Sequence, residues 1–566
     1  MIHRRRLGED TAMTDDAAQL TWDAPGAGQW RSDTTHFPGS PTPFQKEFHF
    51  PHMAAGIGRM FERYGVPLDT FAYRLVNGKV FSRLMPLIGA EKDATKAPPK
   101  PVLWLAVRLH PEFRKRTKNA THAMGNKIWR DELRHWQDVQ RGELYEYNRK
   151  LQDVDLPSLD DVALIDHVRE VFDHTAASHE LHFELHGTDL VPLGDFFANC
   201  ERWGITANEG MATLQGSSPA SVAPASALAD LAKLVADAPV PPKTLDDVRA
   251  LGPAANDALT EFLDEFGWRI VTAYDIDGRC LIELPDAILG TIFAAVDIAD
   301  RTAVEPDDSF VDELRSRVPT EERTLFDELL AESRTVYGLR DENGPLTVEW
   351  PVGLLRRAVL ECGRRLQARG LLHEVEDAVE VSLDELSALV TDASASAPLP
   401  ARDEITARGV ARRQAAAIHP PSVIGPDEPA PPLGVFPEAL RRVTQIAIIA
   451  TSNLEAPAGL EPMHGLGIGT ESYTGTARVG DRPEEVLMRM EPGDVLVVPS
   501  TTPAFNTVLA MAGAVVCEEG GALCHAAVMA REFGFPAVVG ARDAMAIINE
   551  GDRVEVDAVN GRVRVL

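Results

Sequence analysis

Hydrophobic and polar residues follow a helical period over most of the chain. From about Pro111 to Thr391, leucine, valine and phenylalanine recur at spacings of three and four between charged residues, as on amphipathic helices. Glycine and proline interrupt the pattern at intervals. The clearest helical stretches are residues 164–185, 227–236, 256–266 and 354–367. The pattern therefore predicts a large, mostly α-helical domain.

A strand pattern precedes this helical region. Residues 71–76 and 79–81 are rich in aromatic and β-branched side chains, and Asn77-Gly78 separates them. Asn-Gly favours the two-residue turn whose backbone twist matches that of antiparallel strands. We therefore predict a β-hairpin at this point, and helical spacing over residues 53–64 predicts a helix before it.

A different pattern occupies the C-terminal part. A short apolar run at residues 515–517 is followed by Gly520-Gly521, a helical stretch at 526–533 and a second apolar run at 537–539. Short apolar runs on either side of a glycine turn and a helix are typical of an α/β unit. A further buried strand is predicted at 494–498, and Asn560-Gly561 predicts a closing hairpin.

One histidine, His525, stands where the predicted helix of this unit begins. The first turn of a helix presents free backbone N–H groups and the positive end of the dipole, which favour an anion. The preceding glycines allow the backbone to approach whatever the imidazole carries. His525 is therefore suited to carry a phosphoryl group as a nucleophile, whereas the alternative is an ordinary capping or core histidine.

Residues 520–540, GGALCHAAVMAREFGFPAVVG, resemble the phosphohistidine motif of the swivelling domain in the phosphoenolpyruvate-utilising superfamily. That group includes pyruvate phosphate dikinase, phosphoenolpyruvate synthase, rifamycin phosphotransferase and phenylphosphate synthase. Leu523 departs from the motif, since several members carry threonine there. The resemblance implies that His525 is phosphorylated and that the phosphate is held by Gly520, Gly521, Cys524, Ala526 and, from the preceding strand-end loop, Thr502.

The predicted elements and the resemblance together divide the chain. We expect a multidomain protein in which a large, mostly α-helical substrate domain precedes a small α/β swivelling phosphohistidine domain. The expected parts are an N-terminal extension at 1–35, a helical acceptor-binding domain at 36–440 with an extended Pro-rich connector at 398–432, a hinge at 441–463 and the swivelling domain at 464–566.

The composition of the chain limits the classes of partner that it is expected to bind. The chain has 566 residues and a formal net charge of −30, without a cluster of lysine and arginine, so we expect no nucleic-acid partner. Its five cysteines form no CxxC pair or disulfide framework, which indicates reduced thiols in the cytoplasm. No apolar run approaches the ~20 residues that span a bilayer, so no membrane association is expected.

Four histidines gather at His174, His179, His182 and His186, and the last three share one helical face. The spacing from His182 to His186 suits a metal pair, but no acidic third ligand accompanies it, and we predict no metal site. The alternatives are a structural cluster and a polar lining to a substrate cavity. In the second case His179, His182 or His186 is a candidate to deprotonate an acceptor hydroxyl.

Residues 337–386 resemble the helical linker and substrate region of rifamycin phosphotransferase and its relatives. In that comparison Arg340 falls at a basic position near the substrate, while Gly344 stands about where some relatives have a lysine. The resemblance implies that Arg340 faces the transferring phosphate. The alternative is a solvated or helix-capping arginine.

Family members that act alone carry an ATP-grasp domain, and pyruvate-handling members continue into a (β/α)8 barrel. We recognise neither in this sequence, and Gly78-Lys79 lacks the other elements of a phosphate loop. We therefore expect a separate ATP-grasp subunit to bind ATP and Mg²⁺ and to phosphorylate His525, releasing AMP and phosphate.

The division into separate chains resembles phenylphosphate synthase and alkylphenol-phosphorylating systems. It implies a small hydroxylated aromatic acceptor such as phenol or cresol, held in a deep apolar cavity of the helical domain. A rifamycin-like antibiotic is the alternative acceptor. A non-catalytic phosphocarrier or regulator is the alternative of another class.

Overall fold

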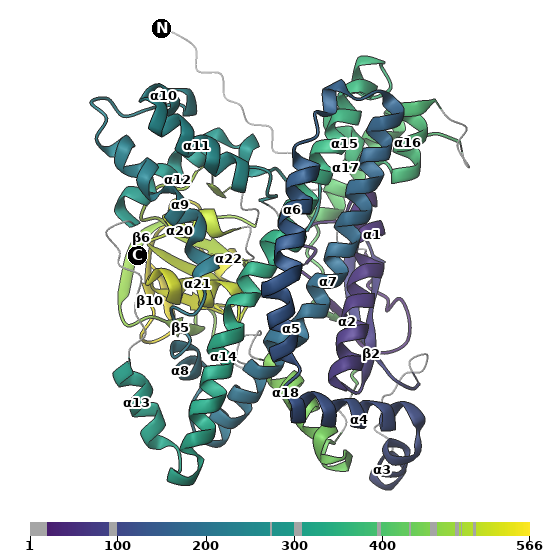
Figure 1. Cartoon of the computed structure of the whole chain (residues 1–566), viewed down its shortest axis with the longest axis vertical. Coiled ribbons are helices and arrows are strands. Elements are labelled where there is room, and N and C mark those ends of the chain that lie inside the picture. The colour runs from purple at the N-terminus through teal and green to yellow at the C-terminus, as the bar shows by residue number, and fades with distance from the viewer. Residues whose placement is uncertain are drawn as a thin grey trace.

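The computed structural model of the chain describes residues 20–34, 36–89, 99–271, 274–298, 308–392, 398–428, 432–452, 461–481, 486–487, 489–501 and 505–566. A helical lobe is built around the long helix α7 (Asp161–Arg202), and a second lobe holds the C-terminal sheet under a cover of helices (Figure 1). The chain is therefore mostly helical with a C-terminal α/β part, as its sequence predicts.

Helix α7 is the axis of the helical lobe. Its 42 residues begin behind Asp160, whose side chain accepts a hydrogen bond from the Ala163 N–H, and Pro192 lies within it. It packs against α2 (Phe50–Tyr64), α14 (Arg323–Gly344), α15 (Trp350–Ala368) and α18 (Glu438–Ser452). The helices predicted over residues 53–64, 164–185 and 354–367 are thereby confirmed.

A four-stranded sheet lies beside these helices, in the order β2-β3-β1-β4. The predicted hairpin is confirmed as β2 (Leu68–Val76) and β3 (Lys79–Pro86). Asn77 and Gly78 between them have φ angles of 52° and 78°, the left-handed values that a two-residue hairpin turn needs. Strands β1 (Trp30–Ser32) and β4 (Val423–Ile424) complete the sheet from distant parts of the sequence.

The Pro-rich segment at 398–432 is not an extended connector throughout, so that prediction was wrong. Residues Arg402–Ala416 form helix α17, and β4 follows it. Arg412 of α17 binds the carboxylates of Glu380 and Asp277. The middle of the segment can form a helix because it is rich in alanine and arginine and its prolines lie only in the flanks. The ion pairs of Arg412 hold this helix against the lobe.

The C-terminal part forms a seven-stranded sheet in the order β11-β10-β6-β7-β8-β9-β5. The four central strands run parallel and the outer three pair antiparallel. The predicted strand, helix and strand at 515–539 are confirmed as β8, α21 and β9, and the closing hairpin as β10 and β11. The strands are β5 (Leu466–Ile468), β6 (Ser472–Val479), β7 (Val495–Val498), β8 (Ala514–Cys517), β9 (Ala537–Val539), β10 (Arg553–Asp557) and β11 (Arg562–Val565).

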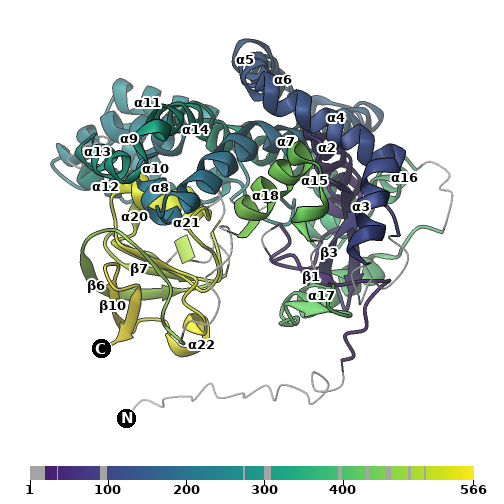
Figure 2. The same cartoon turned by 90° about the horizontal axis from the view of Figure 1, so that it is seen from below.

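Helices from both halves of the chain cover one side of this sheet. Figure 2 shows α20 (Asn506–Met511) and α21 (His525–Phe533) above the strands, with the helices between residues 219 and 298 over them. Apolar side chains of α9 (Pro219–Ala236), α11 (Pro253–Phe266) and α12 (Pro285–Ile298) share one buried core with those of β7, β8 and β9. This side of the sheet is therefore held against part of the predicted helical domain.

The remaining helices complete the two lobes. Among the described helices, none is both long and apolar enough to cross a lipid bilayer. They are α1 (Pro43–Phe48), α3 (Lys100–Leu109), α4 (Pro111–Asn126), α5 (Trp129–His135), α6 (Arg141–Gln152), α8 (Ala207–Ala212), α10 (Leu245–Ala250), α13 (Asp308–Arg317), α16 (Leu383–Thr391) and α22 (Ala544–Ile547).

The predicted hinge at 441–463 begins inside helix α18, which ends at Ser452. Arg442 of this helix pairs with Asp195 of α7, so the start of the segment is fixed to the helical lobe. Residues 453–460 lie outside the described part of the chain. The domain boundaries themselves remain a prediction.

Candidate active site

His525 is the first residue of helix α21, directly after the loop that leaves strand β8. Cys524 precedes it in the N-cap position without a side-chain cap, so the helix start relies on other groups. Gly520 has a φ of 109°, and a Cβ there would lie 2.7 Å from the Cys524 sulfur. The loop needs glycine at this position, because the backbone passes close to the Cys524 side chain.

A hydroxyl fixes the orientation of the imidazole. The Oγ1 of Thr501 lies 3.0 Å from Nδ1 of His525, and Thr501 follows strand β7. The Nε2 atom is shielded from solvent. Because a hydroxyl engages Nδ1, we expect covalent chemistry at Nε2. Sequence reasoning missed Thr501 and chose its neighbour Thr502, which lies outside the described residues.

The other residues predicted to hold the phosphate differ in what they can offer it. The Cys524 N–H donates to the Gly521 carbonyl at 3.1 Å, which closes the turn before the helix. The side chain of Ala526 is 1% exposed and belongs to the core of the C-terminal lobe. Ala526 therefore offers a phosphate only its backbone N–H, at the electropositive helix start.

Helix α21 is docked on the helical half of the chain. Gln215 Nε2 donates to the Arg531 carbonyl, and the Gly216 N–H lies 3.2 Å from both carboxylate oxygens of Glu532. Arg531 in turn binds Oδ1 of Asn208 on α8. Burial against this surface and the nearby Asp341 raise the pKa of Glu532 to about 7.

The loop that carries His525 is also buried against the helical lobe. Ala522, Leu523 and Val528 belong to the same apolar core as Phe183 and Leu185 of α7. Leu523, the departure from the family motif, is 1% exposed and therefore serves this contact. In this arrangement the loop is packed on the helical lobe, while His525 itself is partly exposed.

Two chain segments connect this loop with the histidines of α7. The Thr34 hydroxyl donates to Glu519 at 3.1 Å, and the adjacent Asp33 binds the His36 ring at 3.0 Å. Asp341 of α14 lies near Glu532 and raises its pKa. Two residues further along the same helix, the Asn343 side chain donates a hydrogen bond to the His182 carbonyl. Both segments link the unit that carries His525 to the same region of α7.

The predicted histidines of α7 form part of a larger aromatic group. The rings of His182 and His186 lie 4.9 Å apart, and those of His179 and His49 lie 5.2 Å apart. His36 packs 6.1 Å from His49. We call this group the histidine cluster, and its members are His36, His49, His179, His182 and His186, with Phe37, Phe183 and Tyr274 around them.

Burial keeps the inner histidines neutral. It lowers the pKa of His179 to about 3 and also lowers the pKa values of His49 and His182, where neighbouring histidines add to the effect. His182 Nδ1 lies 3.1 Å from the Thr347 hydroxyl, and His179 Nδ1 contacts the Thr175 carbonyl at 2.9 Å. Sequence reasoning missed His36 and His49 because they lie far from α7 in the chain.

Two further predicted residues do not join the cluster. His174 hydrogen-bonds Asn148 at 2.8 Å and packs on Tyr147, and burial lowers its pKa to about 4. Arg340 lies on α14, but its side chain is outside the described residues, so its phosphate-facing role remains a prediction. Within the described residues, no group of three or more histidine, cysteine or acidic side chains is arranged to hold a metal ion.

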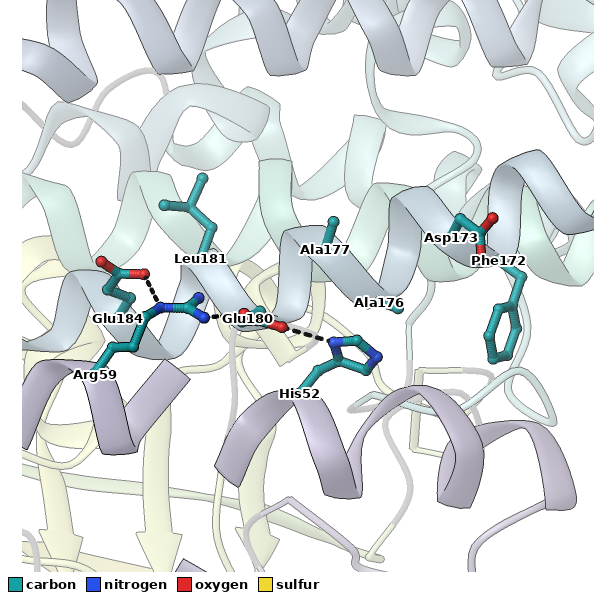
Figure 3. A pocket seen from close by; sticks show the side chains of 9 residues that line it. All are labelled: His52, Arg59, Phe172, Asp173, Ala176, Ala177, Glu180, Leu181 and Glu184. Carbon is teal, nitrogen blue, oxygen red and sulfur yellow. Dashed lines mark hydrogen bonds and ion pairs between the residues drawn. The ribbon is translucent and has the colours of Figure 1, made fainter. Parts of the chain in front are cut away.

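A groove of about 430 Å³ opens between α2 and α7 (Figure 3). Glu180 bridges His52 and Arg59, and Arg59 reaches on to Glu184. Glu180 and Glu184 point away from the face that carries His182, and the groove is ionic. It is not the apolar acceptor cavity predicted from the sequence, which therefore remains a prediction.

The Thr501 contact predicts a modest catalytic effect. Thr501→Val removes one hydrogen bond to the imidazole, worth ~0.5–1.5 kcal/mol net, and leaves the ring free to rotate. We expect phosphoryl transfer from His525 to slow by about 2- to 10-fold, measured by loss of the phosphohistidine signal in ³¹P NMR. Thr501→Ser keeps the hydroxyl and should react near the wild-type rate; an equal loss in both variants would contradict this role.

Comparison with known proteins agrees with this geometry. Residues 490–561 match the model of the PEP-utilising enzyme mobile domain, and residues 196–341 match that of the rifampicin phosphotransferase fourth domain. The first region contains β7, β8, α21 and Thr501. The second begins in α7, ends in α14 and contains Asn208, Gln215 and Gly216, which bind α21.

Three relatives show how far the similarity extends. The whole chain aligns at 25% identity with 15% of chondramide synthase from Chondromyces crocatus. At 28% identity, 56% of the chain aligns with 35% of rifampicin phosphotransferase from Streptomyces sviceus. At 26% identity, 54% aligns with 36% of an uncharacterized phosphotransferase from Bacillus subtilis.

The chain thus spans between 15% and 36% of the length of these three relatives. The family matches and the position of His525 in α21 agree with the resemblance of residues 520–540. The chain is therefore similar to rifampicin phosphotransferase over about half of its length, and its residues 490–561 match the mobile domain of the PEP-utilising enzymes.

Proposed function

We propose that the chain is a phosphotransferase in which His525 receives a phosphoryl group and passes it to an acceptor hydroxyl. The observation that carries this proposal is the placement of His525 at the start of α21, with Thr501 on Nδ1 and the loop packed into the apolar core of the helical lobe. A helix N-terminus stabilises the phosphate and the engaged Nδ1 directs chemistry to Nε2.

The donor in this proposal is ATP with Mg²⁺, bound by an ATP-grasp body outside the sequence of this chain. We place that body on a partner subunit in the cytoplasm and expect AMP and phosphate as by-products. Since Nε2 is shielded in the docked arrangement, the mobile domain must leave the helical half to reach the donor. The contacts of α21 with Gln215 and Gly216 are those that must break.

The acceptor we propose is a small aromatic hydroxyl compound such as phenol or cresol. The aromatic rings of the histidine cluster suit a flat apolar ligand, and its imidazoles can take a proton. Arg340 would steady the transferring phosphate. A rifamycin-like antibiotic is the second candidate acceptor, favoured by the match of residues 196–341 to the rifampicin phosphotransferase fourth domain.

The test bypasses the donor. Full-length protein is phosphorylated with potassium phosphoramidate, a small-molecule phosphoryl donor to histidine, and offered phenol, p-cresol, a rifamycin and pyruvate side by side. The proposal expects the His525 phosphate to move to phenol or p-cresol. Transfer chiefly to rifamycin selects the second acceptor, preferred transfer to pyruvate overturns the assignment, and a phosphohistidine that no hydroxyl discharges indicates a phosphocarrier.

The donor proposal has its own prediction. The chain alone with ATP and Mg²⁺ should not become phosphorylated, whereas addition of a cognate ATP-grasp protein should yield an acid-labile, base-stable phosphoprotein. The measurement is incorporation of ³²P from ATP labelled at the β-phosphate or the γ-phosphate. Autophosphorylation by the purified chain would refute the need for a partner.

A further inference from the structure

Polar atoms without a partner gather in the histidine cluster. Nδ1 of His49 and Nε2 of His179 are buried, and neither makes a hydrogen bond within the described residues. Both side chains are fully buried. An unsatisfied buried polar group is destabilising, and native proteins rarely leave several of them together. The cluster therefore has the properties of a binding site for a ligand that carries a hydrogen-bonding group.

A carboxylate stands behind one histidine of this cluster. Oδ1 of Asp189 lies 3.6 Å from Nδ1 of His186, one helical turn away on α7. Asp189 is 2% exposed at its side chain, and neither of its carboxylate oxygens makes a hydrogen bond within the described residues. A buried carboxylate at one imidazole nitrogen orients the ring and stabilises the charge that forms when the other nitrogen takes a proton.

His186 differs from its neighbours in ways that matter for proton transfer. His179 and His182 are sealed in the core, and their Nδ1 atoms are held by Thr175 and Thr347. The His186 side chain is 23% exposed and has Asp189 as its ionic partner. A general base must be reachable by the group that it deprotonates and must tolerate a positive charge, and His186 meets both conditions.

We propose that the histidine cluster binds the hydroxyl of an uncharged acceptor and that His186, positioned by Asp189, takes the proton of that hydroxyl. This inference rests on the proposed function. In the step, the acceptor oxygen forms a bond to phosphorus, and the bond from phosphorus to Nε2 of His525 breaks with its electron pair left on Nε2. The hydroxyl proton moves to Nε2 of His186.

The charges around the cluster select the class of acceptor. Among the described residues, its ionic partners are carboxylates: Asp33 binds His36, and Asp189 faces His186. The buried imidazoles of His49, His179 and His182 remain neutral because burial lowers their pKa values. A carboxylate on the ligand would be repelled by Asp33 and Asp189, and the neutral imidazoles would supply no cation to compensate. A phenol or an alcohol therefore binds here in preference to an acid such as pyruvate.

The test compares two acceptors that differ in the need for a base. The full chain is phosphorylated with phosphoramidate, and transfer to p-cresol and to p-nitrophenol is followed at neutral pH. p-Cresol must lose its proton during transfer, whereas about half of the p-nitrophenol is already ionised at this pH. His186→Gln should slow transfer to p-cresol by about 10²- to 10⁴-fold and leave transfer to p-nitrophenol within a few fold of wild type.

The p-nitrophenol reaction also reports whether the variant is folded. Asp189→Asn should produce a smaller loss confined to p-cresol, and Asp189→Glu should recover part of it. Added imidazole should restore p-cresol transfer in His186→Ala. An equal loss on both acceptors would show a structural role for His186 and overturn the inference.

The inference and the proposed function fail in different ways. If wild-type protein transfers phosphate to p-cresol and His186→Gln does so at the same rate, the inference is wrong while the function stands. If wild-type phosphohistidine transfers to neither acceptor, both are wrong.

Discussion

Replacement of His525 by alanine should reduce acceptor phosphorylation by about 10⁴-fold or more, because the side chain carries the covalent intermediate. The fold should survive, since His525 is partly exposed at a helix start and alanine is a good helix former. We expect the free energy of unfolding to change by about 1 kcal/mol or less. The measurements are transfer of ³²P to p-cresol and thermal unfolding followed by circular dichroism.

The matched control is His122→Ala. His122 is exposed on α4, so it accepts phosphate from phosphoramidate as any surface histidine does, but it has no place in the proposed transfer. Its loss should leave turnover unchanged. Turnover near the wild-type rate in His525→Ala would refute the phosphohistidine mechanism as a whole.

The elements predicted correctly from the sequence are those specified by local chemistry. The hairpin around Asn77-Gly78 follows from two residues that accept left-handed φ angles. The unit from β8 to β9 follows from short apolar runs, a glycine turn and a helical stretch within 26 residues, 514–539. In such segments the pattern and the turn residues agree with the final structure, so neighbouring residues are sufficient.

Pairings between distant segments were not predictable in this way. Strand β4 joins β1 although Ile424 and Trp30 are 394 positions apart in the chain, and no local pattern identifies such a pair. Helix α17 was missed because its composition, between proline-rich flanks, suggested a linker. The core shared by α9, α11, α12 and the C-terminal sheet was also missed, since periodicity shows that a helix has an apolar face but not what covers it.

The residues of the candidate site also differ in whether neighbouring or distant parts of the sequence bring them together. His525 and its glycine loop lie in one contiguous motif, whereas the histidine cluster joins α7 to His36 and His49 from the N-terminal segment. Thr501 lies 24 positions before His525 and reaches it because parallel strands β7 and β8 end at the same edge of the sheet. A rule for strand ends could have found Thr501, but the sequence contains no signal for His49.

Docking of α21 and its loop on the helical half should weaken as pH rises from about 5 to 7. Glu532 has an ordinary pKa of 4.5, which burial and Asp341 raise to about 7 in the docked arrangement. Because the docked pKa is the higher one, docking takes up a proton, so its contribution is complete below about 4.5 and lost as pH approaches 7. Within that window the docking equilibrium should fall by roughly tenfold for each pH unit.

Two other carboxylates at the interface act in the same direction. Desolvation by the surrounding groups raises the pKa of Glu519 although the residue keeps solvent contact, and the nearby Asp33 adds to that effect, while burial and Glu519 raise the pKa of Glu518. Each of these groups also favours the docked arrangement at low pH. A phosphoryl group on His525 would add negative charge beside them, so phosphorylation should weaken docking further near neutral pH.

Energy transfer between fluorophores can measure this docking. The labels are attached at Val162→Cys on α7 and at Val559→Cys in the turn between β10 and β11, one on each side of the interface. Both sites accept a label, since Val162 is 61% exposed and Val559 is 63% exposed. Transfer efficiency should fall between pH 5 and pH 7 in the wild-type background.

The variant Glu532→Gln cannot ionise at this position, so it should keep the domain docked at pH 7 and flatten the profile. The control Glu471→Gln, at an exposed site, should leave the profile unchanged. A Glu532→Gln profile as steep as that of wild type would assign the pH dependence to other groups, and docking that strengthens with rising pH would contradict the raised pKa of Glu532.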